Sequence, residues 1–142
     1  MPNQEGRPDG ETIKQKLKTA AAFADIDLME YLIRTTYCTR AIGSEVLAET
    51  TKEGNLDVVK LLLKCGANPV LPMGDDRTSL HFAASIGRED ICSELIHSMI
   101  SRDDAYKRTS SSNLTAFDIL REEQDLGKMA TRLQNLADEL PQ

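Results

Sequence analysis

Short segments with regularly spaced apolar residues follow one another along this chain, separated by polar or glycine-containing turns. Between residues 12 and 36, apolar side chains recur every three or four positions in two successive segments, the spacing of a buried helical face. Thr12 with Gln15, and Asp27 with Glu30, supply the polar residues with which helices begin. The pattern therefore predicts an all-α chain built from pairs of short helices.

The segments recur with a fixed period. Gly54 and Gly87 are 33 residues apart, and so are Leu47 and Leu80. Gly66 follows a longer apolar segment, at a place where glycine adopts the left-handed conformation that ends a helix. A period of roughly 20–50 residues is typical of proteins built from stacked structural repeats.

Two stretches share a motif. Arg77–Ile91 reads RTSLHFAASIGREDI, and its glycine-plus-helix half recurs upstream as EGNLDVVKLLLKCGAN over residues 53–68. The period and the T-x-L-H-x-A-A opening resemble the ankyrin repeat, a β-turn followed by two antiparallel helices. Thr50 and Thr51 stand where this motif has two alanines.

The resemblance implies an ankyrin-repeat solenoid that forms a single domain, residues 12–142. The polar residues 1–11, with two prolines and two glycines, predict a flexible tail before it. About four helix-turn-helix repeats are expected, at about residues 12–40, 44–75, 76–112 and 113–140. The first is degenerate, and the last carries the polar face that an end-capping repeat needs. Thr78 and Thr115 are 37 residues apart, which predicts a flexible insertion before the last repeat. The resemblance also implies that Thr78 caps its helix and that Thr78 and His81 hydrogen-bond within and between adjoining turns.

Charge is unevenly distributed. The chain carries a net charge of −6, yet residues 1–40 hold six basic and six acidic groups and sum to zero. Residues 41–142 hold 11 basic and 17 acidic groups and therefore carry the whole −6. Such a surface repels a phosphate backbone, so we expect no nucleic-acid partner and favour a protein with a basic surface.

Candidate chemistry is sparse. Three cysteines without a C-x-x-C pair, and only two histidines, favour neither a disulfide framework nor a zinc site. The T-x-L-H context explains His81 as a turn-stabilising group, and no phosphate-binding glycine motif is present. We therefore expect no catalysis, no metal and no cofactor. We also expect a monomer in the cytoplasm or nucleus that has no membrane partner, because the cysteines suit a reducing compartment and no long apolar run occurs.

Partner-binding positions follow from the resemblance, since ankyrin repeats bind partners through their turn tips and inner helices. Ile86 is an expected exposed apolar anchor within this set. Mapped onto this sequence, the positions are Lys52, Glu53, Asp75, Asp76, Arg77, Ser85, Ile86, Arg88, Ser112, Leu114, Glu122 and Glu123.

The leading functional hypothesis is a small intracellular adaptor or inhibitor that binds a protein partner and performs no catalysis. The alternative is a regulatory or assembly subunit that stabilises a larger complex, and an enzyme with an unrecognised site comes third. Separately, Lys107-Arg108-Thr109-Ser110 resembles the target of a basic-directed kinase. This makes Thr109–Ser112 a candidate phosphorylation segment.

Overall fold

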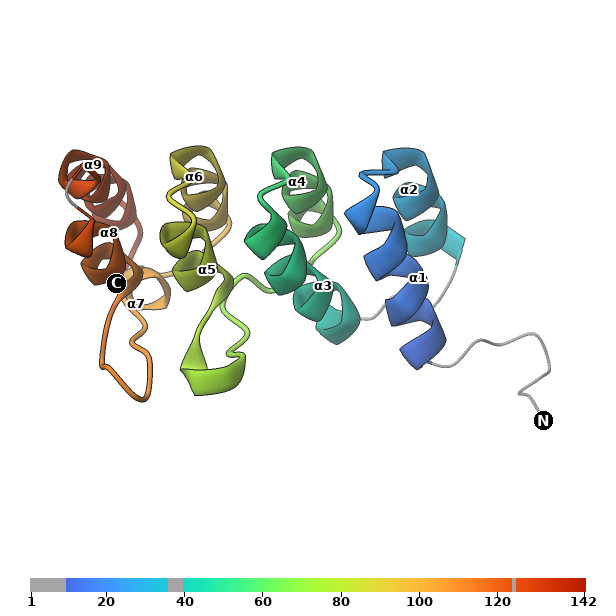
Figure 1. Ribbon diagram of the computed structural model, residues 1–142, viewed down its shortest axis with the longest axis horizontal. Coiled ribbons are helices and arrows are strands. Elements are labelled where there is room, and N and C mark those ends of the chain that lie inside the picture. The colour runs from blue at the N-terminus through green and yellow to red at the C-terminus, as the bar shows by residue number, and fades with distance from the viewer. Residues whose placement is uncertain (1–9, 36–39, 124) are drawn as a thin grey trace. The chain divides into compact units, whose positions relative to one another are not determined.

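The computed structural model describes residues 10–35, 40–123 and 125–142 of the chain, and their helices are arranged in pairs (Figure 1). Most of the predicted flexible tail, residues 1–9, lies outside the described residues, and Gly10 already belongs to the first helix. Among the described residues the only β-type pairing is a single bridge between Met73 and Arg77. The predicted all-α class is therefore confirmed.

Contacts divide the chain into two compact units, Met1–Asn68 and Pro69–Gln142. The single domain that we expect over residues 12–142 stays a prediction. None of the helices within the described residues combines the length and the apolar character needed to cross a bilayer.

The first unit contains two helix pairs. Its helices are α1 (Gly10–Ala22), α2 (Ile26–Thr35), α3 (Arg40–Glu53) and α4 (Leu56–Lys64). The helices within each pair pack together, α1 packs on α3, and α2 packs on α4. The apolar stripes meet in a core that includes Leu17, Met29, Leu47 and Leu62. The pair over residues 12–36, predicted from apolar spacing, is thereby confirmed.

Asp25 caps α2, two residues before the helix start that the sequence predicts at Asp27. The Asp25 Oδ1 accepts a hydrogen bond of 3.1 Å from the Leu28 N–H. An N-cap side chain satisfies an amide that has no partner inside the helix. The prediction was wrong because Asp25 and Asp27 are equally good caps in sequence, and only the turn before them decides between the two.

A residue in the left-handed conformation forms the turn between the helices of three pairs. Gly54 and Gly87 have φ of 79° and 68°, whereas Ala24 occupies the corresponding turn between α1 and α2 with φ of 53°. Left-handed backbone costs a residue with a Cβ about 1–2 kcal/mol. The degenerate first pair therefore keeps the turn geometry at an energetic cost.

We expect Ala24→Gly to raise the free energy of unfolding by about 0.5–1 kcal/mol. Glycine removes the left-handed penalty, and the greater backbone freedom of the unfolded chain offsets part of that gain. Urea denaturation followed by circular dichroism measures the change. Gly54→Ala is the matched control, and it should lower the free energy of unfolding. An unchanged or lower value for Ala24→Gly would contradict the strain assigned to this turn.

Two threonines of α3 occupy the positions where the repeat motif has alanines. Thr50 and Thr51 are both buried, at 1% and 0% exposure. The Thr51 Oγ1 donates a hydrogen bond of 2.8 Å to the Leu47 carbonyl. The Thr50 Oγ1 has no hydrogen-bond partner in the described part of the chain. A buried hydroxyl in that condition costs about 1–3 kcal/mol.

Thr50→Val should therefore raise the free energy of unfolding by about 1 kcal/mol, because it replaces the unpartnered hydroxyl with a methyl group and keeps the branched shape. Thr51→Val makes the same chemical change one residue along and removes a satisfied hydrogen bond, so it should bring no gain. Chemical denaturation of the two variants side by side measures the difference. Equal effects of the two substitutions would show that the hydrogen-bonding difference is not what matters.

The second unit also contains two helix pairs, with one smaller element before the first pair and another between the pairs. Its elements are the 3₁₀ helix η1 (Gly74–Asp76), α5 (Ser79–Ser85), α6 (Glu89–His97), α7 (Arg102–Ala105), α8 (Ala116–Glu122) and α9 (Gly127–Asp138). The short helices α5 and α8 pack on each other, and each packs on its longer partner, α6 or α9, which are also in contact. Leu80, Ile91, Leu95, Phe117 and Leu133 are buried between them.

The stretch between α6 and α8 has more order than the flexible insertion that the sequence predicts. It contains α7, whose Ala105 is 2% exposed. The Tyr106 hydroxyl donates a hydrogen bond of 2.8 Å to the Asp138 carboxylate, and its ring centroid lies 5.0 Å from that of Phe117. The Arg102 N–H donates to the Pro141 carbonyl at 2.8 Å. These contacts fix α7 against the end of α9, and the polar composition of the stretch concealed them.

Candidate functional site

His81 joins two successive repeats of the second unit. Its Nδ1 accepts a hydrogen bond of 3.0 Å from the Thr78 N–H. Because Nδ1 is the acceptor, the ring proton is on Nε2, which donates to the Leu114 carbonyl at 3.1 Å. The side chain is 1% exposed. Both ring nitrogens are therefore committed to structure, which confirms the role that the resemblance implies for Thr78 and His81.

Burial lowers the pKa of His81 below its usual value of 6.5, although hydrogen bonds to the Leu114 and Lys107 carbonyls oppose this. The folded state thus takes up the proton at lower pH than the unfolded state. The stability that His81 contributes is complete above pH 6.5 and is lost as the pH falls below that value, because the unfolded chain then binds more protons.

We expect the wild-type free energy of unfolding to fall by about 1 kcal/mol more than that of His81→Gln between pH 7.5 and pH 5.5. The glutamine variant does not titrate in this range, so the carboxylates that contribute to both proteins cancel in the comparison. Urea denaturation at the two pH values gives the result. A larger acid-induced loss in the variant would contradict the lowered pKa.

Two loops of the second unit lie side by side at the N-terminal ends of α5 and α8, beneath the helices in Figure 1. We name residues 73–77 the first tip and residues 107–114 the second tip. The Ser110 N–H donates to the Asp75 carbonyl at 2.9 Å. The Ser111 N–H and Oγ donate to the two carboxylate oxygens of Asp75 at 2.7 and 2.8 Å, and the Ser110 Oγ donates to Asp76. The two tips are thus fastened together by hydrogen bonds.

These bonds have an electrostatic consequence. Hydrogen bonds from Ser111 hold the pKa of the Asp75 carboxyl below its ordinary value, and Arg77 adds to the effect. Asp75 and Asp76 also adopt left-handed backbone, with φ of 65° and 56°. Their assignment as partner-binding positions stays a prediction, and in the structure both accept hydrogen bonds from the neighbouring tip.

A groove of about 590 Å³ lies at the opposite, C-terminal ends of α5 and α8, and we name it the acidic groove. Its wall comes from the α5–α6 turn and from the turn before α9: Ser85, Ile86, Gly87, Glu123, Asp125 and Leu126. A Cβ on Gly87 would lie 3.3 Å from the Leu126 Cδ1. Glycine at this turn therefore allows both a left-handed backbone and the close approach of the next repeat.

The acidic groove combines an exposed apolar side chain with negative charge. Ile86 is 39% exposed. Glu123 and Asp125 are exposed, and neither pairs with a cation among the described residues. The Arg88 Nη2, next to the groove in sequence, lies 2.8 Å from the Asp90 carboxylate. The groove therefore carries negative charge that its own residues do not neutralise.

Within the second unit, the predicted partner-binding residues fall into two separate groups. One group lies at the tips: Asp75, Asp76, Arg77, Ser112 and Leu114. A second lies at or near the acidic groove: Ser85, Ile86, Arg88, Glu122 and Glu123. The seven residues of α5 separate the two groups, a length of about 10 Å. Lys52 and Glu53 end α3 in the first unit.

Sequence reasoning missed Asp125 and Leu126, which complete the acidic groove. The sequence did contain a signal that could have located these two residues. The 37-residue offset that aligns Thr78 with Thr115 also aligns Arg88 with Asp125. Following this offset past Glu123 would have placed the turn before α9 beside the α5–α6 turn.

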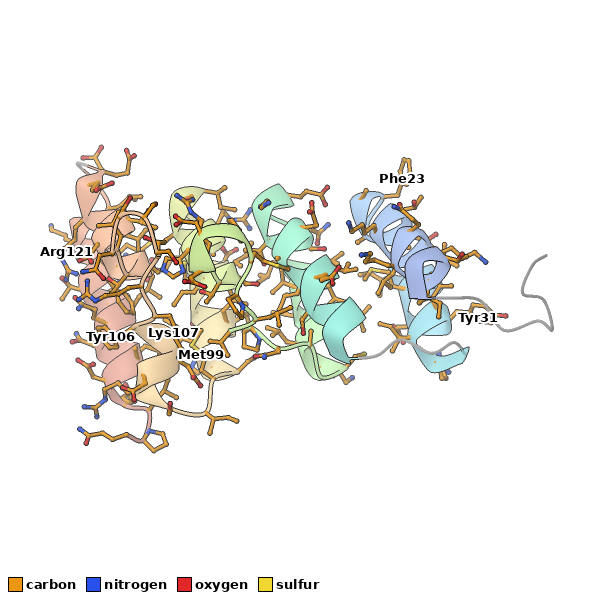
Figure 2. The ribbon with its side chains drawn as sticks, turned by 90° about the horizontal axis from the view of Figure 1, so that it is seen from below. Phe23, Tyr31, Met99, Tyr106, Lys107 and Arg121 are labelled. Atoms are coloured by element: carbon orange, nitrogen blue, oxygen red, sulfur yellow. The ribbon has the colours of Figure 1, made fainter. Side chains whose placement is uncertain are left out.

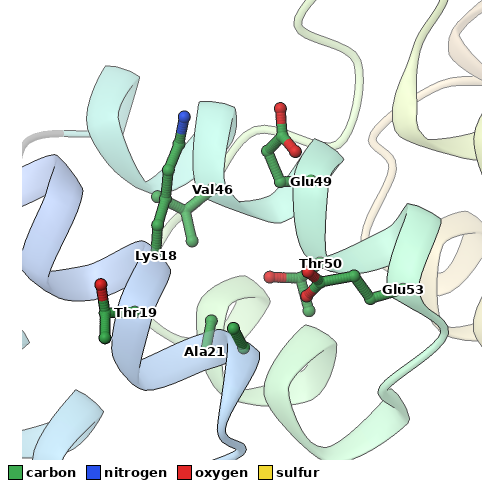
Figure 3. Close-up of a pocket in the computed structure, with 8 residues that line it drawn as sticks. Lys18, Thr19, Ala21, Val46, Glu49, Thr50 and Glu53 are labelled. Atoms are coloured by element: carbon green, nitrogen blue, oxygen red, sulfur yellow. The ribbon is translucent and has the colours of Figure 1, made fainter.

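A smaller pocket of about 240 Å³ lies between α1 and α3 in the first unit (Figure 3). Of its lining residues, only Glu53 was predicted as a binding position. Lys18 extends from α1 and Glu49 from α3 on the same side of the pocket. The cation offsets part of the negative charge of the two glutamates, so this pocket has a weaker charge preference than the acidic groove.

The two cysteines in the described part of the chain, Cys65 and Cys92, are poorly suited to redox chemistry, and Cys38 lies outside that part. Cys92 is buried, and burial raises the pKa of its thiol to about 12. Burial also raises the pKa of the exposed Cys65 thiol. A reactive thiol needs a lowered pKa, since the thiolate is the nucleophile. Across the described ranges, no three His, Cys, Asp or Glu side chains converge as metal ligands would.

Comparison with known proteins agrees with this architecture. The family model of ankyrin repeats in three copies matches residues 17–110, which is more than half of the chain. The chain is also similar to Notch-regulated ankyrin repeat-containing protein B of Danio rerio, at 43% identity over 54 residues, which is 38% of this chain and 49% of the relative. The Homo sapiens protein of that description shows the same identity over 47% of its length.

The chain thus spans about half the length of the curated relatives it matches. The family match includes α2, α3, α4, α5 and α6, together with the threonine and histidine that link the repeats. Repeats of this kind are protein-binding modules that are typically non-catalytic. With helix pairs, left-handed turns and the Thr78–His81 linkage all in place, the chain belongs to the ankyrin-repeat family.

Proposed function

We propose that this protein is a non-catalytic adaptor or inhibitor that binds a basic segment of another protein in the acidic groove. The observation that carries the proposal is the exposed Ile86 beside Glu123 and Asp125, two carboxylates without a cationic partner among the described residues. The name of the relatives describes those proteins as Notch-regulated, and it specifies no binding partner. The partner's chemistry is therefore argued from the groove.

A segment with one apolar side chain between lysine or arginine residues fits this groove best. The apolar side chain would cover Ile86 and Leu126, and the cations would lie against Glu123 and Asp125. Exposed charges of this kind contribute mainly to the association rate and to specificity, and salt screens them. The apolar contact supplies the part of the affinity that persists in salt.

The test begins with capture of partners from a lysate by the full chain, followed by mass spectrometry and a titration with the captured partner. Glu123→Lys combined with Asp125→Lys should weaken the binding about tenfold or more at physiological salt. The matched control is Asp103→Lys with Glu139→Lys, which makes the same change in net charge at exposed positions outside the groove. Equal binding by both double variants would contradict the proposal that the partner binds in the acidic groove.

A second candidate function is supported by the first unit. Phe23, Tyr31 and Leu28 are 81%, 59% and 42% exposed, and Phe23 and Tyr31 project from the α1–α2 pair in Figure 2. Leu28 and Tyr31 are three residues apart on α2 and so share one helix face, and an exposed apolar face is typical of a surface covered in a complex. This favours the alternative of a subunit that stabilises a larger assembly. Stoichiometric co-purification that Leu28→Glu abolishes, and the groove variants leave intact, would support this alternative over the adaptor.

A further inference from the structure

The fastening between the two tips depends on hydroxyl groups that a kinase can modify. The second tip contributes Ser110 and Ser111, whose side chains donate to Asp76 and Asp75. Lys107 and Arg108 precede these serines, and both are exposed. Lys107 is labelled in Figure 2. A short basic segment, two serines and two carboxylates thus meet at one exposed place.

Geometry narrows the candidate segment Thr109–Ser112 to two hydroxyls, those of Ser110 and Ser111, and the preceding cations favour Ser110. Thr109 is 4% exposed, and its Oγ1 accepts a hydrogen bond of 3.2 Å from the Leu114 N–H, so it is inaccessible. Ser112 is exposed, but its Oγ approaches only the Ser111 Oγ, at 3.4 Å, among the described side chains. Ser110 and Ser111 are both exposed. Ser110 has two cations, Arg108 and Lys107, two and three residues before it, whereas Ser111 has only Arg108 within three residues. The arrangement with two cations is the one that a basic-directed kinase selects.

We propose that Ser110 is a phosphorylation site for a basic-directed serine kinase, and that its phosphate separates the second tip from the first. The kinase transfers the γ-phosphoryl group of ATP. The bond from the γ-phosphorus to the β–γ bridging oxygen breaks, a bond to the Ser110 Oγ forms, ADP leaves, and the hydroxyl proton passes to a base of the kinase. The acidic groove, at the other end of α5, plays no part in this step.

The separation follows from charge. Phosphorylation removes the proton that the Ser110 Oγ donates to Asp76 and adds a charge of about −1.5 to −2 next to Asp75 and Asp76. The Arg108 Nη1 already donates to the Asn113 carbonyl at 2.7 Å and lies 3.6 Å from the Asp118 carboxylate. The Arg108 guanidinium is therefore already engaged by groups of its own repeat, and Arg77 of the first tip already lies 3.8 Å from the Asp75 carboxylate. The phosphate and the two aspartates repel each other.

The separation of the two tips does not extend to the base of the second tip. The Thr109 N–H donates to the Leu114 carbonyl at 3.0 Å, and His81 donates to that same carbonyl. These bonds hold the two ends of the second tip together and join them to α5. Neither bond involves Asp75 or Asp76. Only the amides of Ser110 and Ser111, which donate to Asp75, lose their partners.

The test uses the full chain, Mg·ATP and the catalytic subunit of cAMP-dependent protein kinase, with the modified residue located by tandem mass spectrometry. Phosphate is expected at Ser110, and Ser110→Ala should abolish its incorporation, whereas Ser111→Ala should not. Incorporation confined to another residue, or no incorporation, would overturn the assignment of the site.

Amide hydrogen exchange, followed by NMR on the phosphorylated full chain, tests the separation. The amides of Ser110 and Ser111 should exchange about tenfold faster than in the unmodified protein, and the amide of Thr109 should be unchanged. The Ser110→Ala protein carried through the same kinase reaction serves as the unmodified control. Unchanged exchange at Ser110 and Ser111 in the phosphorylated chain would overturn the separation, as would a general loss of protection that includes Thr109.

Discussion

Replacing His81 with leucine should lower the free energy of unfolding by about 2–5 kcal/mol. The substitution leaves the Thr78 N–H and the Leu114 carbonyl without the ring nitrogens that they bond in a buried place. Each buried group without a partner costs about 1–3 kcal/mol. The loss should be large because the two bonds join successive repeats, each of which depends on its neighbour for stability. Chemical denaturation of the purified variant measures it.

His97→Leu is the control for this substitution. His97 lies in the last turn of α6 and is exposed, so the same chemical change there should alter the free energy of unfolding by less than about 0.5 kcal/mol. A comparably small effect at His81 would mean that the linkage between repeats contributes little to stability.

Phe117→Ala should cost about 3–5 kcal/mol, the usual range for removing a buried aromatic side chain. Phe117 is 1% exposed, and α8, which carries it, packs on both α5 and α9. Its ring also lies against Tyr106, which follows α7, so the cavity would open beside three helices. The melting temperature and the denaturation midpoint should both fall.

Phe23 offers a matched comparison, because it is 81% exposed. Phe23→Ala should change the free energy of unfolding by no more than about 0.5 kcal/mol. If both phenylalanine variants were destabilised equally, the assignment of Phe117 to the core of the second unit would be contradicted.

The sequence was sufficient for the repeat architecture because the signals behind it are local. The T-x-L-H motif determined the caps of α5, and the 33-residue period located the turns at Gly54 and Gly87. Apolar spacing alone found the first helix pair. It could not reveal that Ala24 adopts the left-handed conformation that Gly54 and Gly87 adopt in the later turns, since an alanine in the sequence does not indicate that conformation.

The site was harder to predict because it depends on which loops become neighbours. Asp75 and Asp76 looked like solvated binding positions, and only the fold shows that Ser110 and Ser111 bind them. The acidic groove was half predicted, through Ser85, Ile86 and Glu123. The remainder was missed because the turn before α9 lacks the glycine signature of the earlier turns. The order of α7 was missed for a related reason, since it packs on α9, which is distant in sequence.

The central claim, that the acidic groove is the partner-binding surface, is tested most directly by amide NMR of the full chain. The isotope-labelled protein is titrated with the basic segment of the captured partner, at low salt and at physiological salt. We expect the largest shift changes at Ser85, Gly87 and Leu126, weakening as salt increases. Changes concentrated at the two tips or in the first unit, with the groove amides unmoved, would contradict the account.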